Sequence, residues 1–351
     1  RLFLSATPRN GFPESFTALL HLLDNQRFLR GAEINRAQLE TVMVRRLKSE
    51  LETNWDGSRR FAKREVLHID VAYTPAEKAA HAQLQEYARL LQGTAGTPGE
   101  RAAVDFVLKL LKKRLFSSPA AFLTTIEKHA ASIGSARRAA DSSVRRQIQA
   151  TEDEYANDEE AEQLLLDAVE VASQAAVPTG AEPKRLLAGL QTFAREASRC
   201  ADSKAEALLD WLRTHIKPGG TWSNERVIIF TEYRATLNWL LDQLAANGFG
   251  GIEKRVMMIY GGMDPKDREA VKNAFQANPA DSPVRILLAT DAASEGLNLQ
   301  NHCWRLFHFE IPWNPNRMEQ RNGRVDRHGQ KAPEVHIHHF VAKGFELARP
   351  S

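Results

Sequence analysis

Three arginines stand three residues apart in the segment "EQRNGRVDRHGQ", residues 319–330. The residues are Arg321, Arg324 and Arg327, with Gly323 and Gly329 beside them. A guanidinium is a planar fork of donors that fits phosphate oxygens, so the segment predicts a phosphate-binding site. The alternative is a surface helix in which the arginines pair with Glu319 and Asp326. Like charges stacked on one helical face repel, and this disfavours the alternative.

A phosphate site needs elements that position it, and the second half of the chain is patterned for a parallel sheet. Short apolar runs occur at residues 226–231, 255–260, 285–290, 304–309 and 334–341. Helical patterns at 234–247 and 264–277 separate the first runs. This alternation predicts crossover units with helices on both faces of the sheet. Ligands of such sheets bind at the carboxyl ends of the strands.

Groups that suit a nucleic-acid backbone follow these runs. Gly261 and Gly262 follow the second run and let backbone amides approach a phosphate closely. Thr290, Ser294 and Asn298, at and after the third run, supply hydroxyl and amide groups. One such turn is ordinary loop chemistry, but turns of this kind after successive strands favour a shared binding edge.

The first 200 residues are organised differently. Apolar spacing and composition predict a strand over 1–7, helices over 12–24 and 35–48, a half-buried strand over 65–73 and a mainly helical section over 75–200. The acidic stretch near 151–162 is expected to be a loop between helices.

The net charge is small, 47 Lys and Arg against 44 Asp and Glu, and does not by itself indicate a nucleic-acid partner. Its distribution is uneven, because residues 101–150 hold ten Lys or Arg and residues 151–182 hold ten acidic residues with no Lys or Arg. Such blocks are typical of solvated helical faces, and a basic arm on nucleic acid is the alternative. The cations of that arm would be Lys112, Lys113, Arg114, Arg137, Arg138, Arg145 and Arg146.

Other signals are weaker. The two cysteines, Cys200 and Cys303, lie far apart without metal-ligand spacing, which favours a reducing compartment such as the cytoplasm. No apolar run approaches the roughly 18–20 residues of a membrane span, so we expect no membrane partner. In "HIHH", His336 and His338 face away from His339 on a strand, and we expect no metal site there.

Taken together, the motifs resemble those of superfamily-two helicases. "FLSATP" is similar to motif III, "VIIFTEY" to motif IV, "ILLATDAASEGLNLQ" to motif V and the arginine segment to motif VI. The ending "GRVDRHGQ" resembles the SWI/SNF-type branch, as do "VMVRRLKSEL" at 42–51 and "DSKAEALLDWL" at 202–212. "LSATPRNGF" and "KKRLFSSPAAF" are most similar to bacterial members, such as RapA-like translocases and the DISARM phage-defence helicase.

The resemblance implies an α/β, RecA-like lobe that sandwiches ATP with a second lobe. By motif position, Arg327 would be the arginine finger at the γ-phosphate, Arg324 its partner, and Gln320 the residue that orients them. Gly296, Asn298 and Gly323 would also lie at the nucleotide. Nucleic-acid contacts would come from Thr231, Gly261, Gly262, Thr290, Ser294 and Asn298. Coupling between the sites would come from Ser5, Ala6 and Thr7.

The chain departs from the family pattern at its start. The pattern G-x-x-x-x-G-K-[ST] is absent, and no acidic pair precedes "SAT". ATP and Mg²⁺ would therefore be held mainly by a first RecA-like lobe that this chain lacks, and we expect the chain alone to hydrolyse no ATP. The expected divisions are a remnant of the first lobe at 1–34, an inter-lobe link at 35–74, a helical insertion at 75–200 and the second lobe at 201–351.

These residues predict the C-terminal motor-lobe portion of an ATP-dependent translocase on double-stranded DNA. Its partners would be the missing lobe in cis and RNA polymerase or phage-defence subunits. Two alternatives stay open. One is a non-catalytic scaffold lobe that binds protein or nucleic acid. The other is an RNA helicase, which the motif VI ending and the long insertion disfavour.

Overall fold

The structure is a computed structural model, and it describes residues 2–3, 13–44, 46, 50–51, 53–57, 59–133, 148–149, 151, 157–175, 180–251, 254–294, 297–312 and 314–343. Eight residues with predicted roles lie outside this set, namely Ser5, Ala6, Thr7, Arg137, Arg138, Arg145, Arg146 and Gly296.

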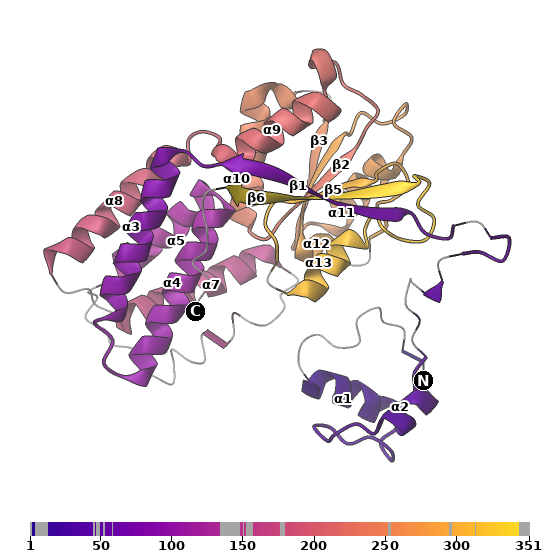
Figure 1. The fold of residues 1–351 in the computed structure, drawn as a ribbon, viewed down its shortest axis with the longest axis horizontal. Helices are drawn as coiled ribbons and strands as arrows, with labels where there is room; N and C mark the ends of the chain where they lie inside the picture. The colour runs from indigo at the N-terminus through magenta and orange to yellow at the C-terminus, as the bar shows by residue number, and fades with distance from the viewer. Residues whose placement is uncertain are drawn as a thin grey trace.

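An all-parallel sheet of six strands is formed by five strands from the second half of the chain and one from near its start (Figure 1). The strand order is β1-β6-β5-β2-β4-β3. The bounds are β1 Lys63–Ala72, β2 Val227–Thr231, β3 Val256–Ile259, β4 Ile286–Thr290, β5 Arg305–His308 and β6 Glu334–Lys343. All residues of β2 and β4 are buried, because both faces of these central strands are covered. The predicted RecA-like α/β class is confirmed.

Helices cover the two faces of the sheet. Ile229 of β2 packs with Leu208 of α9 and Leu240 of α10, whereas the neighbouring Phe230 packs with Phe275 of α11 on the opposite face. The alternation of side chains along a strand therefore divides the apolar run between two cores. The helices of this half are α9 Ser203–His215, α10 Arg234–Leu244, α11 Pro265–Gln276, α12 Asp291–Ser294 and α13 Pro315–Asn322, with a 3-10 turn at Pro218–Gly220 and a π turn at Ala245–Phe249.

The edge strand β1 comes from the segment expected to link the lobes. It pairs with β6 in parallel from Lys63 opposite Glu334 to Ala72 opposite Lys343. As on many edge strands several of its apolar residues are exposed, and Val66 is 61% exposed, although Val71 is buried. The segment 35–74 therefore contributes a strand to the parallel sheet.

The insertion is a bundle with its own core. Its helices are α3 Pro75–Gln92, α4 Pro98–Ser117, α5 Pro119–Ser132, α7 Asp158–Ala175 and α8 Ala181–Ala197. Tyr87, Leu111 and Phe122 are fully buried in this core. Helices α3 and α4 begin sharply because Thr74 and Thr97 each close a capping box before a proline. The prediction of a loop near 151–162 is wrong from Asp158 on, because α7 begins there, and residues 152–156 lie outside the described residues.

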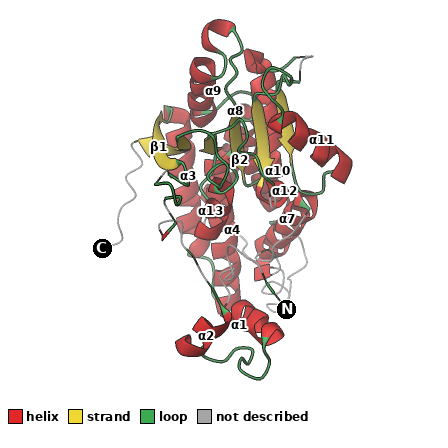
Figure 2. Cartoon of the chain, turned by 90° about the vertical axis from the view of Figure 1, so that its right-hand side faces the viewer, coloured by secondary structure: helices red, strands yellow, loops and turns green. Residues whose placement is uncertain are grey.

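Two further helices lie at the foot of both views, α1 Pro13–Leu23 and α2 Arg36–Val42 (Figures 1 and 2). They share a small apolar cluster around Phe16, Leu20 and Phe28. Helix α2 is shorter than the predicted 35–48, because Met43 is already extended.

Candidate nucleotide and nucleic-acid site

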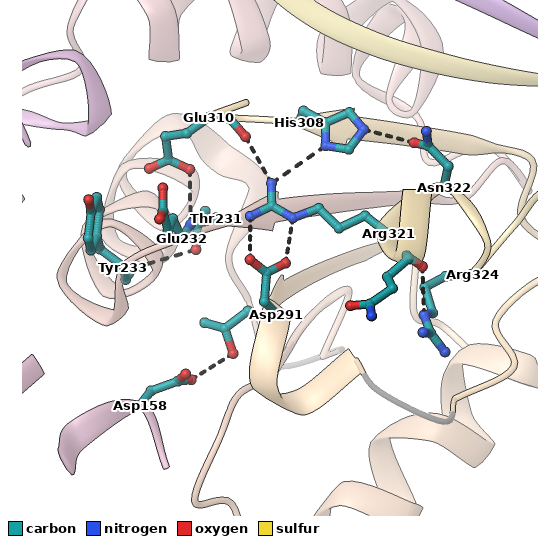
Figure 3. Close-up of polar contacts among 12 residues, drawn as sticks. Asp158, Thr231, Glu232, Tyr233, Asp291, His308, Glu310, Arg321, Asn322 and Arg324 are labelled. Atoms are coloured by element: carbon teal, nitrogen blue, oxygen red, sulfur yellow. Dashed lines mark hydrogen bonds and ion pairs between the residues drawn. The ribbon is translucent and has the colours of Figure 1, made fainter. Parts of the chain in front are cut away.

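Arg321 lies at the carboxyl ends of the central strands (Figure 3). Its guanidinium binds both carboxylate oxygens of Asp291, with Nε 2.5 Å from Oδ1 and Nη2 2.9 Å from Oδ2. Nη1 donates to the backbone carbonyl of Glu310 at 2.8 Å. Arg321 is fully buried, so its attraction to Asp291 acts in a medium of low dielectric and is strong. These contacts hold α13 against the segments that follow β4 and β5.

His308 completes this buried cluster. Its Nε2 lies 2.9 Å from Oδ1 of Asn322, and its Nδ1 faces Nη1 of Arg321 at 3.5 Å. Burial lowers the pKa of His308 to about 4, and the positive charge of Arg321 acts in the same direction. The ring is therefore neutral at pH 7.

Arg324 and Arg327 lie beyond the end of α13. The helix ends at Asn322 with Gly323 as its cap, so the three arginines do not form one helical stripe. Arg324 donates to the carbonyl of Leu297 at 3.1 Å and to that of Gln320 at 3.0 Å. Arg327 donates to the same Leu297 carbonyl at 3.4 Å and contacts Asn298 Oδ1. Both arginines are half-buried.

The structure thus brings most of the predicted nucleotide set together. Arg324, Arg327, Asn298, Gly323 and the backbone of Gln320 meet where the segment after β4 contacts the end of α13. Only Gly296 of that set lies outside the described residues.

The acids next to the arginines bind a residue from far earlier in the chain. Arg64 of β1 binds Glu319 with Nη1 2.8 Å from Oε1, and binds Asp326 with Nη2 2.6 Å from Oδ2. The arginine segment is therefore fastened to the sheet edge, and the alternative of a simple surface ion-pair helix does not describe it. No local pattern indicates this contact, because Arg64 lies 255 residues before Glu319.

The predicted nucleic-acid residues gather at the neighbouring strand ends. Thr231 and Thr290 are register partners at the ends of β2 and β4. The amide of Gly261 and the hydroxyl of Thr290 both donate to Oδ2 of Asp158, each at 2.6 Å. Gly262 has a positive φ of +87°, which a residue with a side chain rarely adopts.

Three of the predicted contacts are placed differently. Thr231 is fully buried, and its hydroxyl is 3.5 Å from the carbonyl of Tyr233. Asn298 lies with Arg327 in the arginine cluster. Ser294 ends the short helix α12, and its side chain lies outside the described set.

The insertion bundle docks on the same edge of the sheet. Lys113 binds Glu232 at 2.5 Å, and the buried Arg114 binds Glu162 through two 2.8 Å hydrogen bonds. The Arg114 guanidinium also lies 3.8 Å from the ring centre of Tyr233. Two cations of the predicted basic arm, Lys113 and Arg114, therefore form ion pairs within the protein, and these pairs neutralise their charges. The arginines at 137, 138, 145 and 146 lie outside the described residues.

No group of three or more His, Cys, Asp or Glu side chains that could hold a metal ion occurs among the residues described. His338 of the "HIHH" run stacks on Phe307 at 4.5 Å between ring centres, and burial lowers its pKa to about 3. In the same part of the chain, no helix is both long and apolar enough to cross a membrane.

The fold and this edge define the class, a RecA-like lobe with arginines and polar turns at its strand ends. Residues 203–329 match the family described as the helicase conserved C-terminal domain. The chain is 39% identical over 123 residues to the uncharacterized ATP-dependent helicase YqhH of Bacillus subtilis, over 34% of this chain and 19% of that protein. It is 36% identical over 137 residues to the DNA repair and recombination protein RAD54-like of Drosophila erecta, over 39% and 16%.

A third relative is the SNF2 domain-containing protein CLASSY 4 of Arabidopsis thaliana, 31% identical over 141 residues, 40% of this chain and 12% of that protein. The match thus spans less than a fifth of the length of these relatives. Among solved structures, the C-terminal part of the Fun30 ATPase domain aligns with a TM-score of 0.44 and 17% identity, over 81% of this chain and 86% of that one. The Sulfolobus solfataricus SWI2/SNF2 ATPase C-terminal domain aligns with a TM-score of 0.42 and 14% identity, over 80% and 81%.

The sequence matches confirm the resemblance to the C-terminal half of SWI/SNF-type superfamily-two helicases, and residues 203–329 match the helicase conserved C-terminal domain.

Proposed function

We propose that this chain is the C-terminal motor-lobe portion of an ATP-dependent translocase on double-stranded DNA. The observation that carries the proposal is the difference among the three arginines. Arg321 is buried and bound to Asp291, whereas Arg324 and Arg327 stay half-buried at the sheet edge and share the carbonyl of Leu297. Arg327 donates to the neutral carbonyl of Leu297, which is a weaker partner for a guanidinium than a phosphate oxygen, so this side chain suits an incoming phosphate.

Arg327 acts as the finger in this proposal, with Arg324 beside it. Phosphoryl transfer needs charge neutralisation in the transition state, and an arginine finger contributes on the order of 10³-fold or more in rate. The Gly-rich loop with its Lys, and the acids for Mg²⁺, belong to a first RecA-like lobe in cis. The chain alone would therefore bind nucleotide poorly and hydrolyse none.

The nucleic-acid side of the proposal rests on the turns after β3 and β4. The Gly261 amide and the Thr290 hydroxyl point at one common position, where a backbone phosphate oxygen would accept both hydrogen bonds. Such contacts carry no sequence information, as a motor that moves along any duplex requires. The preference for duplex DNA follows from the family resemblance.

The domain assignment belongs to the same proposal. Residues 1–34 would be part of the first lobe, 35–74 the link with its edge strand, 75–200 the insertion and 201–351 the second lobe. The protein would act in the cytoplasm, with RNA polymerase or phage-defence subunits as partners.

The test uses the parent protein with its first lobe, assayed for ATP hydrolysis without nucleic acid and with duplex DNA, single-stranded DNA and RNA. We expect strong stimulation by duplex DNA. Stimulation by RNA alone would instead support the RNA helicase, and an absence of hydrolysis under every condition would support the scaffold lobe.

A further inference from the structure

The position proposed for a DNA phosphate is occupied by a carboxylate of the same chain. Asp158, the first residue of α7, is labelled in Figure 3. Its Oδ2 accepts hydrogen bonds from the Gly261 amide and the Thr290 hydroxyl, both at 2.6 Å. In return the amide of Asp158 donates to the carbonyl of Gly261 at 3.3 Å. The insertion therefore contacts the turns after β3 and β4 through side chain and backbone.

Asn157, the residue before Asp158, packs against the same turn at Gly262. The Oδ1 of Asn157 lies 2.7 Å from the place where a Cβ on Gly262 would stand. Gly262 therefore leaves room for Asn157, and Asn157 and Asp158 together cover both glycines of the turn.

A cation lies near the carboxylate of Asp158. Burial raises the pKa of Asp158, whereas the hydrogen bonds from Thr290 and Gly261 and the charge of Arg234, at the start of α10, act in the opposite direction. The Nη1 of Arg234 is buried and has no hydrogen-bond partner among the described residues. A cation with a donor to spare beside an anion position is suited to a group with more oxygens than a carboxylate, such as a phosphate.

Asp158 and a phosphate cannot use this position together. An amide has one hydrogen to donate and a threonine hydroxyl has one, and both are given to Asp158. We propose that the start of α7 is an autoinhibitory contact, in which Asp158 holds the phosphate position until duplex DNA displaces it. This inference rests on the proposed function, because it assumes that DNA binds at Gly261 and Thr290.

The bundle is built so that only the first turn of α7 has to move. Glu162, one turn further along α7, is bound by Arg114 through two hydrogen bonds of 2.8 Å. This buried ion pair ties α7 to α4 independently of the contact with Gly261. The end of a helix opens at low free-energy cost compared with its middle. Release of Asp158 therefore leaves the rest of the insertion in place.

The test compares Asp158→Ala with Glu159→Ala in the full chain, by fluorescence anisotropy on a short labelled duplex. Glu159 is exposed on the same turn, so its variant removes the same charge without touching the phosphate position. We expect Asp158→Ala to bind about tenfold more tightly or better, because the competing state is lost, and Glu159→Ala to stay close to wild type. Equal effects of the two variants would overturn the inference, because they would show that Asp158 weakens duplex binding only through its negative charge.

Two further measurements show whether a failure concerns this inference or the proposed function. Adding Thr290→Val to Asp158→Ala should abolish the gain in affinity, because one of the two donors is gone. If wild type and all variants fail to bind duplex, the proposed function itself is overturned.

A measurement on the wild-type chain guards against a variant that does not fold. Hydrogen exchange should show that saturating duplex exposes the amide of Asp158, which now donates to Gly261. Unchanged protection of that amide at saturation would overturn the inference.

Discussion

The guanidinium of Arg321 and the carboxylate of Asp291 face one another at the carboxyl edge of the sheet, joined by hydrogen bonds of 2.5 and 2.9 Å. Arg321 belongs to α13 and Asp291 begins α12, so the pair joins the segment after β4 to the segment that carries Arg324 and Arg327. Arg321, the most buried of the three arginines, therefore has a structural role. It positions the segment that carries the other two.

Removing Arg321 should be costly to the fold. Arg321→Ala leaves the Asp291 carboxylate without its cation, and loss of one partner of a buried pair typically costs about 3–5 kcal/mol in the free energy of unfolding. Chemical denaturation of the full chain measures this loss. The control is Arg213→Ala, which breaks the exposed pair with Asp210 and should cost less than about 1 kcal/mol. Equal losses in the two variants would show that Arg321 is not a structural anchor.

Lys204 is a second buried anchor between the bundle and the lobe, and the charge of Glu310 acts on it. The Nζ of Lys204 donates to the carbonyls of Phe116 and Ser117 at 2.6 and 2.7 Å, and Glu310 accepts from the Ser117 hydroxyl. Burial lowers the pKa of Lys204, while the Glu310 charge raises it. We expect Lys204→Met to reduce the free energy of unfolding by about 3 kcal/mol, because the two carbonyls lose their buried donor and Glu310 loses a nearby cation.

A double-mutant cycle with Glu310→Gln checks the reason for that loss. The two changes together should cost at least 0.5 kcal/mol less than the sum of the single losses, roughly the lower bound for groups in contact. Strict additivity would mean that the two charges do not interact across the interface.

His308 predicts how stability depends on pH. Its pKa in the fold is about 4 against an ordinary 6.5, so between these values the unfolded chain binds a proton that the folded chain does not. The stabilisation is present above pH 6.5 and is lost as pH falls towards 4. From pH 7 to pH 5 this single group should lower the free energy of unfolding by about 2 kcal/mol. Denaturation of His308→Gln at both pH values should show a smaller fall than wild type, and an equal fall would contradict the assignment.

The strands were predictable because their apolar runs are buried on both faces. The run 285–290 became β4 at Ile286–Thr290, and the run 226–231 became β2 at Val227–Thr231, each within one residue. The polar turns after them could be ordered as well, since parallel strands put their carboxyl ends at one edge.

Contacts between segments that are far apart in the sequence could not be predicted. Nothing near Arg64 or Glu319 indicates that they meet, because the pairing of β1 with β6 that brings them together is non-local. The different environments of Arg321 and Arg324 depend on where α13 ends, and the regular spacing of the arginines suggested a single stripe instead. The acidic composition of the stretch that holds Asp158 favoured a solvated loop, whereas the chain folds it onto Gly261 and Thr290.

The most direct test of the motor assignment is the steady-state rate of ATP hydrolysis by the parent protein at saturating duplex DNA, for wild type and Arg327→Ala. Arg327 is half-buried and its contacts are to Leu297 and Asn298, so the variant should keep its fold and its affinity for duplex. We predict a fall in kcat on the order of 10³-fold, as expected for loss of an arginine finger. An Arg327→Ala protein that folds, binds duplex and hydrolyses ATP at the wild-type rate would contradict the account.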